Sequence, residues 1–410
     1  MTTTESGPAP SLIGRNPDLR RPLRIAQVTP PLERVPPSAY GGTERVVFEL
    51  VGELHRRGHQ VTTFASGDSE VPGRLIQTVP KALRPAGQGG DPGPWFDLTV
   101  AAVMERAHEF DLIHSHLEAA SAVLARAVSV PVVSTFHGRL DFEWAPRLLK
   151  GVPGLVAISR HQASALPEVR WAGIVHNGLS LEHAPFERRR GEGLVFVGRV
   201  APEKGIIESI EIARLTGRPL TIAAKIGTQP DELAYYEEEF KPALEAAGDL
   251  VEFVGEVDAE DRDRLLSAAY ALLMPGSWPE PFGLTAIEAL ATGTPVLTRR
   301  VGALPEIIRE GVDGFFGDDA AHMAFLADRV AGLDREAIRE SVLQRFSAKR
   351  MTDDYAAVYA KVMGEAERRA EAGSGVGRPA TPAKESDEAG LDEVAERVAA
   401  VRGPGGVAGR

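Results

Sequence analysis

The chain has 410 residues, 43% of them apolar, so it can bury a large core and is expected to fold as two domains. Its formal net charge of −12 disfavours a nucleic-acid partner. The absence of cysteine excludes disulfides, Cys–Zn sites and thiol nucleophiles. No apolar run is as long as a membrane span, and the N-terminus lacks the pattern of a secretory signal. We therefore expect a cytoplasmic enzyme.

The first half of the chain predicts a doubly wound α/β domain. Residues 1–21 are rich in Thr, Pro, Ser and Arg without periodicity, and we expect them to be disordered. After them, apolar runs alternate with amphipathic ones, and the first helix is expected to open at Gly41-Gly42-Thr43-Glu44. Strands are predicted at 23–29, 59–65, 110–114, 130–136, 155–158 and 174–178. Residues 22–185 should form this domain, and a polar segment at 183–193 should link it to the next.

The second half repeats the α/β alternation. Strands are predicted at 194–198, 220–225, 251–254, 271–274 and 295–298, with a charged helix over 231–247 and a helix near 304–310. We expect a second Rossmann-like domain over 190–345, and residues 336–368 look helical. Residues 370–410 are predicted to be mostly disordered, with a short helix over 391–401.

The stretch Glu280-Pro-Phe-Gly-Leu-Thr-Ala-Ile-Glu288 contains the strongest site signal. A buried strand ends at Pro275, a loop follows, and a helix begins near Leu284. Free amides and the positive end of a helix dipole would then be available to an anion. The two carboxylates Glu280 and Glu288 flank this anion site.

Two cations, Arg199 and Lys204, follow the first strand of the second half in a glycine-flanked loop. The carboxyl ends of strands in open α/β sheets face the ligand crevice, so this pair suits a diphosphate. The residues alone leave a solvated basic loop as the alternative. The glycines at 41 and 42 also have two interpretations. They could let the backbone approach a phosphate closely, or they could form a turn that needs positive φ.

Three histidines stand at strand ends. His114 and His116 could form a metal pair, but no third ligand has metal-type spacing, and we expect no metal site. His137 could handle a proton or bind a hydroxyl, or it could be structural. Asp261-Arg-Asp263 has the pattern of a cation-binding motif but lies in a predicted helix, and we interpret it as a solvated face. The absence of a G-x-x-x-x-G-K-[ST] loop and of a G-x-S-x-G motif disfavours triphosphatases and serine hydrolases.

Taken together, the ordered motifs over residues 22–365 resemble the family 4 glycosyltransferases, which are retaining enzymes of the GT-B fold. The motifs are Gly41-Gly42-Thr43-Glu44, Asp111-Leu-Ile-His-Ser-His116, Ser134-Thr-Phe-His-Gly138, His176-Asn-Gly178, Gly198-Arg-Val-Ala-Pro-Glu-Lys-Gly205 and the E-x7-E pair Glu280/Glu288. The resemblance implies two Rossmann-like domains facing each other across a cleft. It also implies that residues 346–368 are closing helices that pack back on the first domain.

The same resemblance implies the roles of the site residues. Arg199 and Lys204 would hold the donor diphosphate, Glu280 the hydroxyls of the transferred sugar and Glu288 the ribose, and His137 would lie beside the reacting sugar. Phosphate would contact Gly42 and the amides of Gly283 and Leu284, and the donor site would also include Gly41, Thr43 and Phe282. His116 and Glu118 are the acceptor-side candidates. No cofactor is expected, because preorganised cations and amides stabilise the leaving diphosphate.

We therefore expect a metal-independent retaining hexosyltransferase, with UDP-glucose as the best candidate donor and a carbohydrate, lipid or small molecule as acceptor. A nucleotide-sugar epimerase, a phosphorylase of the same fold and a catalytically silent nucleotide-sugar-binding protein are the alternatives. No basic amphipathic stretch requires a membrane, yet contact with a membrane surface to reach a lipid acceptor stays open, as does the oligomeric state.

Overall fold

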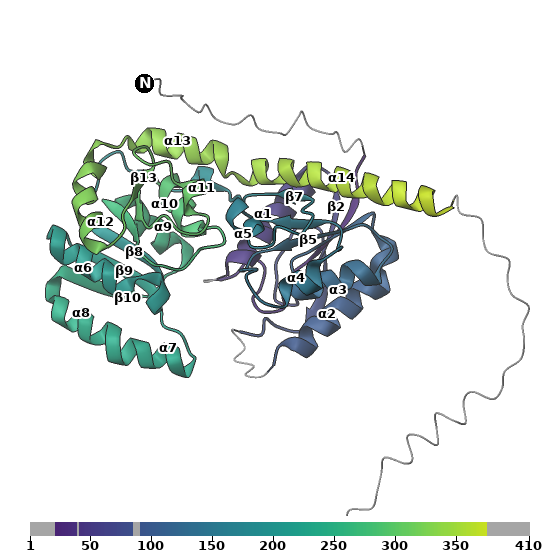
Figure 1. The fold of residues 1–410 in the computed structure, drawn as a ribbon, viewed down its shortest axis with the longest axis horizontal. Helices are drawn as coiled ribbons and strands as arrows, with labels where there is room; N and C mark the ends of the chain where they lie inside the picture. Colours follow the sequence, from purple (N-terminus) through teal and green to yellow (C-terminus); the bar gives the residue numbers. More distant parts are fainter. Residues whose placement is uncertain (1–20, 39–40, 85–90, 375–410) are drawn as a thin grey trace, which may run out of the picture. The chain divides into compact units, whose positions relative to one another are not determined.

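The computed structural model describes residues 21–38, 41–84 and 91–374. Within them the chain forms two Rossmann-like domains, each built on a parallel sheet, as predicted (Figure 1). The predicted disordered lead, apart from Arg21, and the predicted helix over 391–401 lie outside the described residues. No helix in the described ranges is long and apolar enough to cross a membrane.

The sheet of the first domain has the strand order β3-β2-β1-β4-β5-β6-β7, and every pairing is parallel. Its strands are β1 (Arg24–Val28), β2 (Gln60–Ser66), β3 (Arg74–Val79), β4 (Leu112–Ser115), β5 (Val132–Phe136), β6 (Leu155–Ala157) and β7 (Gly173–Ile174). Its helices are α1 (Gly42–Arg56), α2 (Gly93–Arg106), α3 (Ala119–Ala127), α4 (Ala145–Leu149) and α5 (Arg160–Ser164).

The sheet of the second domain has the order β10-β9-β8-β11-β12-β13, again parallel throughout. Its strands are β8 (Leu194–Arg199), β9 (Leu220–Lys225), β10 (Val251–Gly255), β11 (Ala271–Met274), β12 (Val296–Thr298) and β13 (Gly314–Phe316). Its helices are α6 (Ile206–Thr216), α7 (Pro230–Tyr235), α8 (Lys241–Ala247), α9 (Ala259–Ala268), α10 (Leu284–Ala291), α11 (Leu304–Ile307), α12 (Ala320–Ala327) and α13 (Arg335–Arg345). A π-helical turn, Tyr236–Phe240, joins α7 to α8.

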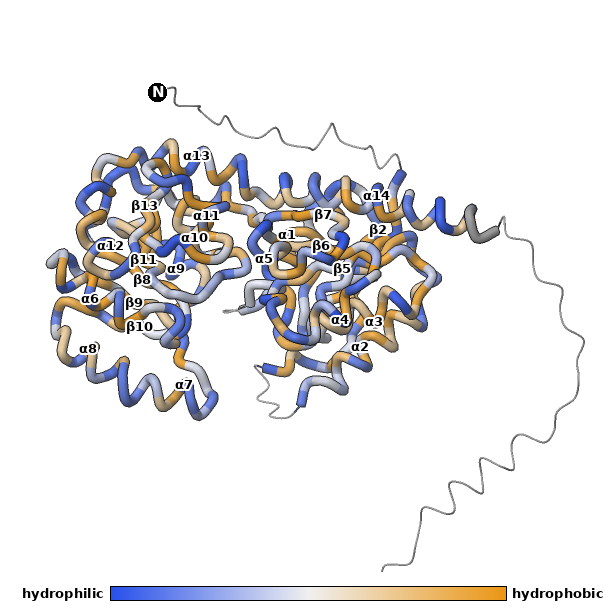
Figure 2. Tube along the Cα trace, in the orientation of Figure 1, coloured by the Kyte–Doolittle hydropathy of each residue, from blue (hydrophilic) through white to orange (hydrophobic). Residues whose placement is uncertain are grey.

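The central strands are apolar because parallel sheets are covered on both faces (Figure 2). One continuous apolar cluster runs from the first domain through Val175 and Leu179 to Phe282 and Phe346 of the second. The apolar contact between the domains is therefore part of the core.

The last helix, α14 (Ala348–Ser374), returns to the first domain (Figure 1). Tyr355 and Tyr359 are fully buried, and Nζ of Lys361 donates to the carbonyl of Ala172 at 2.6 Å. α14 extends to Ser374, so residues 370–374, predicted to be disordered, are helical.

Five elements, α2, α4, α12, β3 and β13, have no counterpart in the sequence predictions. β3 is an edge strand whose residues are mostly half-exposed, so its apolar alternation is weak. α2 leaves Leu98 and Met104 exposed, which blurs the apolar stripe expected of an amphipathic helix.

Candidate active site

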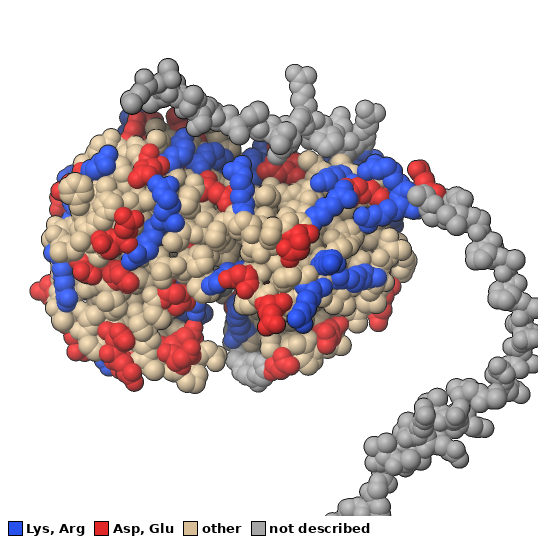
Figure 3. Space-filling view, viewed as in Figure 1, with Lys and Arg blue, Asp and Glu red and all other residues tan. Residues whose placement is uncertain are grey.

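A cavity of about 550 Å³ lies between the two domains and is lined by residues of both. Figure 3 shows the molecule hollowed between the domains, with basic side chains at the edge of the hollow. In each sheet the strand order reverses at one point, between β1 and β4 and between β8 and β11. Ligands of open α/β sheets bind outside the carboxyl ends of the strands at such points. The cavity therefore lies where the topology predicts a ligand site.

The wall formed by the second domain contains the predicted cations. Nζ of Lys204 forms an ion pair with Oε1 of Glu280, although the two residues are 76 positions apart. Nη1 of Arg199 donates to Glu232 at 2.6 Å, and its Nη2 donates to Glu203 at 3.1 Å. Both cations are thus held by carboxylates and point to the same cavity.

A close backbone contact positions Lys204. The short turn Pro202–Lys204 ends at Gly205, which has φ of 74° in the left-handed region. A Cβ atom at Gly205 would lie 2.6 Å from the backbone nitrogen of Gly276, at the start of the Glu280 loop. Glycine is therefore required here both by its φ and by the space available.

The loop that contains Glu280 leads directly into α10. Gly283, with φ of 116°, precedes the helix, and Gly283 and Leu284 line the cavity with Glu280. Phe282 also lines the cavity, and its ring packs against those of His176 and Phe346 at centroid distances of 5.8 Å. This packing anchors the loop, and the start of an eight-residue helix faces the cavity.

Glu288 lies one turn into α10 and is 5% exposed. Its Oε1 forms ion pairs with Arg45 of the first domain and, at 3.3 Å, with Arg262 of α9. A buried carboxylate between two guanidinium groups is strongly positioned, and one of the two comes from across the cavity.

The glycine loop of the first domain meets the start of α10. A Cβ atom at Gly42 would lie 3.2 Å from Cδ1 of Leu284, and one at Gly41 would lie 2.7 Å from Cβ of Pro37. The φ of Gly41 is 164°, which is extended backbone, so close approach and not a left-handed turn accounts for glycine there. Thr43 and Glu44 line the cavity as well, and burial raises the pKa of Glu44 to about 7.

His137 and Glu118 form the other part of the first domain's wall. Oε1 of Glu118 accepts hydrogen bonds from the backbone N–H groups of His137 at 2.9 Å and of Gly138 at 3.0 Å. Burial outweighs these bonds and raises the pKa of Glu118 to about 7. Within the described ranges Glu118 is the only non-glycine residue with positive φ, 50°, a conformation that clusters at functional sites.

His116 lies behind His137 and not at the cavity surface. Its Nδ1 is 2.9 Å from Nε2 of His137, and its side chain is fully buried. From the sequence we expected His116 to contact an acceptor directly. Because its side chain is buried behind His137, His116 can affect a ligand only through His137. His114 is also buried, and its ring nitrogens contact the hydroxyls of Tyr359 and Thr135 at 2.8 Å each.

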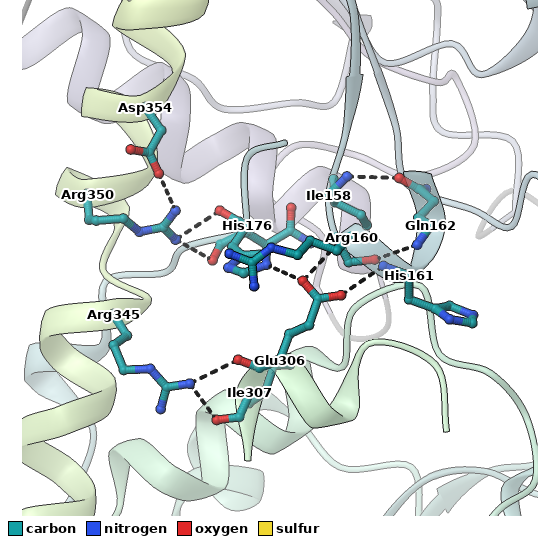
Figure 4. Close-up of polar contacts among 12 residues, drawn as sticks. Ile158, Arg160, His161, Gln162, His176, Glu306, Ile307, Arg345, Arg350 and Asp354 are labelled. Carbon is teal, nitrogen blue, oxygen red and sulfur yellow. Dashed lines mark hydrogen bonds and ion pairs between the residues drawn. The ribbon is translucent and has the colours of Figure 1, made fainter. Parts of the chain in front are cut away.

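A junction of polar groups joins the domains beside the cavity (Figure 4). The carboxylate of Glu306, on α11 of the second domain, accepts from the backbone N–H groups of Arg160 and His161 at 2.9 Å each. It also accepts from Nε2 of His176 at 2.8 Å. Burial alone would raise the pKa of Glu306, but the hydrogen bonds from His176 and from the two amides outweigh it and lower the pKa.

The same junction ties α14 to the segment that follows β7. Arg350 donates to the carbonyls of His176 at 2.9 Å and Asn177 at 2.8 Å, and it pairs with Asp354 at 2.7 Å. Asn177 lines the cavity, and its Oδ1 has no hydrogen-bond partner within the described part of the chain.

Sequence reasoning missed several of these residues. Arg45 follows the glycine loop, but a single Arg in an amphipathic helix gives no signal. Arg262 lies inside the Asp-x-Asp pattern that was interpreted as a solvated face, yet its side chain is only 14% exposed and reaches Glu288. Glu306 and Arg350 act across the domain boundary, which sequence spacing does not reveal.

Family models and known proteins place this geometry in context. The model "Glycosyltransferase Family 4" matches residues 40–183, and "Glycosyl transferases group 1" matches residues 184–338. The glycogen synthase of Mycobacterium tuberculosis is 29% identical over 338 residues, covering 68% of this chain and 79% of that protein. The D-inositol 3-phosphate glycosyltransferase of Mycobacterium marinum is 28% identical over 410 residues, covering 85% and 87%.

Among solved structures, Anabaena HepE in complex with UDP and glucose shares the fold, with a TM-score of 0.62 and 19% identity. The similarity covers 86% of this chain and 100% of that one. The two family models adjoin at the domain junction and together span residues 40–338, most of the chain. The chain therefore belongs to the family 4 glycosyltransferases and is a glycosyltransferase of the GT-B fold.

Proposed function

We propose that this enzyme is a metal-independent retaining hexosyltransferase that uses a nucleoside-diphosphate sugar, with UDP-glucose as the best candidate donor. The observation that carries the proposal is the cavity, in which Arg199, Lys204 and the start of α10 face His137 and Glu118. HepE, which shares the fold, was solved with UDP and glucose, and this supports the choice of donor.

Transfer would break the bond between the anomeric carbon and the diphosphate oxygen, and negative charge would grow on the leaving group. Lys204 and Arg199, with the first amides of α10, are the groups placed to stabilise that charge. In the ligand-free protein carboxylates neutralise both cations. Donor phosphates would compete with Glu280 for Lys204 and with Glu203 and Glu232 for Arg199.

Release of Lys204 would leave Glu280 free to bind hydroxyls of the transferred sugar. Its negative charge would also oppose the positive charge that develops at the anomeric carbon. We assign Glu280 to orientation and charge stabilisation, and not to nucleophilic attack. In a front-face transfer the acceptor oxygen bonds to the anomeric carbon as the diphosphate leaves, and the acceptor proton passes to a diphosphate oxygen.

Because two side-chain cations and a helix terminus are positioned for the diphosphate, we propose that transfer needs no divalent metal. Activity should be the same with added Mg²⁺ and with excess chelator. A loss of activity in chelator that Mg²⁺ restores would contradict this part of the proposal.

The test of function is a donor panel read by released nucleotide. Purified protein is incubated with UDP-glucose, UDP-galactose, ADP-glucose or GDP-mannose, with and without a mixture of sugar, polyol and lipid acceptors. We expect slow release of nucleotide from UDP-glucose alone and faster release with the true acceptor. NMR of the product then shows whether the anomeric configuration is retained.

The same experiment separates the alternatives. An epimerase would change the sugar without an acceptor, and a phosphorylase would release sugar phosphate only when phosphate is added. A silent binding protein would show donor binding without release of nucleotide at any enzyme concentration. The Lys204→Ala variant is the matched control, since release of nucleotide that is as fast in this variant as in the wild type comes from a contaminant.

A further inference from the structure

A chain of hydrogen-bonded side chains lies behind His137, and the proposed transfer does not use it. We call it the relay. Its members are Gln27 on β1, His114 on β4, His116 after β4, Thr135 on β5, and Tyr355 and Tyr359 on α14, and all six are 0% exposed. Such a continuous polar network inside a core must satisfy its donors and acceptors, because each unpaired group is costly.

The distances connect the relay to the cavity. Nε2 of His137 is 2.9 Å from Nδ1 of His116, and Nε2 of His116 is 3.1 Å from Oε1 of Gln27. Nε2 of Gln27 donates to the hydroxyl of Tyr359 at 3.2 Å. The side chain of Gln27 therefore joins the histidines to α14.

The histidines His114, His116 and His137 are all neutral at pH 7. Burial lowers the pKa of His137 to about 4, and burial lowers the pKa values of His114 and His116 well below their usual range. A neutral imidazole has one N–H and one bare nitrogen, and the bond made by one nitrogen decides the state of the other.

The orientation of Gln27 therefore sets the direction of every bond toward the cavity. Its Oε1 can only accept, so Nε2 of His116 carries the hydrogen and Nδ1 of His116 is bare. Bare Nδ1 must accept, so His137 donates from its Nε2. His137 consequently has a bare Nδ1.

The other branch has the same polarity. Because Gln27 donates to the oxygen of Tyr359, the hydrogen of that hydroxyl is available to Nδ1 of His114, and Nε2 of His114 can then donate to Thr135. The hydroxyl of Thr135 then donates to that of Tyr355, 3.1 Å away. Gln27 contacts both Tyr359 and His116, so its amide couples α14 to the cavity wall.

We propose that the relay holds His137 as the tautomer with hydrogen on Nε2, so that its bare Nδ1 accepts a hydrogen bond from a hydroxyl of the bound ligand. Gln27 and Tyr359 are positioning residues in this proposal, because neither lines the cavity. That the ligand is a sugar rests on the proposed function. The tautomer itself does not.

Glu118 adds a second hydrogen-bond acceptor to the wall beside His137. Its Oε1 is held by two backbone amides, and the carboxylate lies beside His137 in the cavity lining. The bare Nδ1 of His137 and the acidic side chain of Glu118 both accept hydrogen bonds from hydroxyl groups. Both would disfavour a ligand that carries its own carboxylate. The wall would thus select a neutral hexose over a hexuronate.

The first test reads the tautomer in the ligand-free protein and is independent of the function. Two-bond ¹H–¹⁵N spectra of protein labelled with ¹⁵N-histidine distinguish protonated from bare ring nitrogens, and a His137→Gln variant assigns the His137 signals. We expect Nε2 protonated and Nδ1 bare. Hydrogen on Nδ1 would overturn the proposal.

A matched pair of variants on α14 tests the coupling. Tyr359→Phe removes the hydroxyl that orients Gln27, and Tyr355→Phe removes a buried hydroxyl one turn away, at the far end of the relay. We expect the His137 nitrogen signals to shift toward a mixture of tautomers in Tyr359→Phe and to stay unchanged in Tyr355→Phe. Unchanged signals in both variants would overturn the relay as the cause. If Tyr359→Phe does not fold, Gln27→Met removes the same hydrogen bond between Gln27 and Tyr359 from the side of β1.

The second test uses transfer and pairs each monodeoxy donor with the monofluoro donor at the same carbon. Fluorine can accept a weak hydrogen bond but cannot donate one. At the hydroxyl bound by His137, both analogues should lower kcat/KM by a similar factor, about two- to tenfold. Full activity of the fluoro donor where the deoxy donor fails would show that His137 donates. Inactivity with every donor would overturn the proposed function but leave the spectroscopic result standing.

Discussion

The two walls of the cavity differ in how they treat charge. The second domain presents cations and carboxylates in pairs, as in Lys204–Glu280 and Arg199–Glu232, and these side chains are between 21% and 32% exposed. Around His137 the first domain presents groups whose charge burial disfavours, since the pKa of His137 is lowered to about 4 and that of Glu118 is raised to about 7. One wall is suited to a diphosphate, and the other to uncharged hydroxyls.

Burial accounts for the difference. Half-exposed ion pairs can exchange partners at small cost, because water screens them. Side chains sealed behind a sheet have no such freedom, and their positions are fixed by hydrogen bonds, as in the relay behind His137. We therefore expect the charged wall to rearrange when the donor binds and the wall around His137 to be preformed.

The largest effect should come from removing charge on the second domain's wall. Lys204→Ala removes a cation placed for the leaving diphosphate, and we expect kcat to fall about 10²- to 10³-fold, the usual loss when one such group is deleted. Glu280→Gln should have a loss of the same order. Steady-state transfer from the donor identified by the panel measures both.

The control for this pair is Lys241→Ala, which removes an exposed cation paired with Glu237 on the outer helix. It should keep full activity, and thermal unfolding should show that Lys204→Ala is folded. If Lys204→Ala transfers at the wild-type rate, the charged wall does not stabilise the leaving group, and the contrast between the walls fails.

An intermediate effect is expected where the two walls are joined, at Glu306. Glu306→Gln keeps the shape but replaces an acceptor of three hydrogen bonds by an amide whose N–H₂ would face another donor. We expect a loss of about 1–3 kcal/mol in the free energy of unfolding. Because α11 packs on the Glu280 loop, where the N–H of Ala303 donates to the carbonyl of Glu280 at 2.8 Å, activity should fall about tenfold as well.

Glu310→Gln is the matched control, since Glu310 forms an ion pair with Arg300 and is 48% exposed. It should change the free energy of unfolding by less than about 0.5 kcal/mol. Equal effects of the two substitutions in denaturant titrations would mean that Glu306 does not hold the walls together.

Much of the second domain's wall could be predicted from the sequence. Arg199, Lys204, Glu280 and the start of α10 lie within two short segments at the carboxyl ends of β8 and β11. Their local pattern of glycine, proline and charge was enough to expect an anion site. The sheet topology then brings those segments to one switch point.

The relay behind the first domain's wall could not be predicted from the sequence, because its members lie far apart along the chain. Gln27 and Tyr359 are 332 positions apart, and in sequence each is one polar residue inside an apolar segment. His114 and His116 suggested a metal pair only because they are close in sequence. Their true partners come from β1, β5 and α14, which only the folded chain brings together.

The last effect concerns stability alone and involves Glu44, a buried acid of the first domain's wall. Burial raises its pKa from 4.5 to about 7, so between these pH values the folded protein binds a proton that the unfolded chain has released. The free energy of unfolding should therefore fall as pH rises from about 4.5 to about 7, by at most about 3 kcal/mol from this group, and be flat above. Glu44→Gln cannot ionise and should lack this part of the fall.

Urea titrations at half-unit pH steps measure the slope. Glu105→Gln, an exposed position on α2, is the control and is expected to follow the wild type. Glu118 contributes a fall over the same range, so a reduced slope should remain in Glu44→Gln. A slope as steep as that of the wild type would mean that Glu44 is already ionised in this range, and its part of the first domain's wall would then be charged like the second.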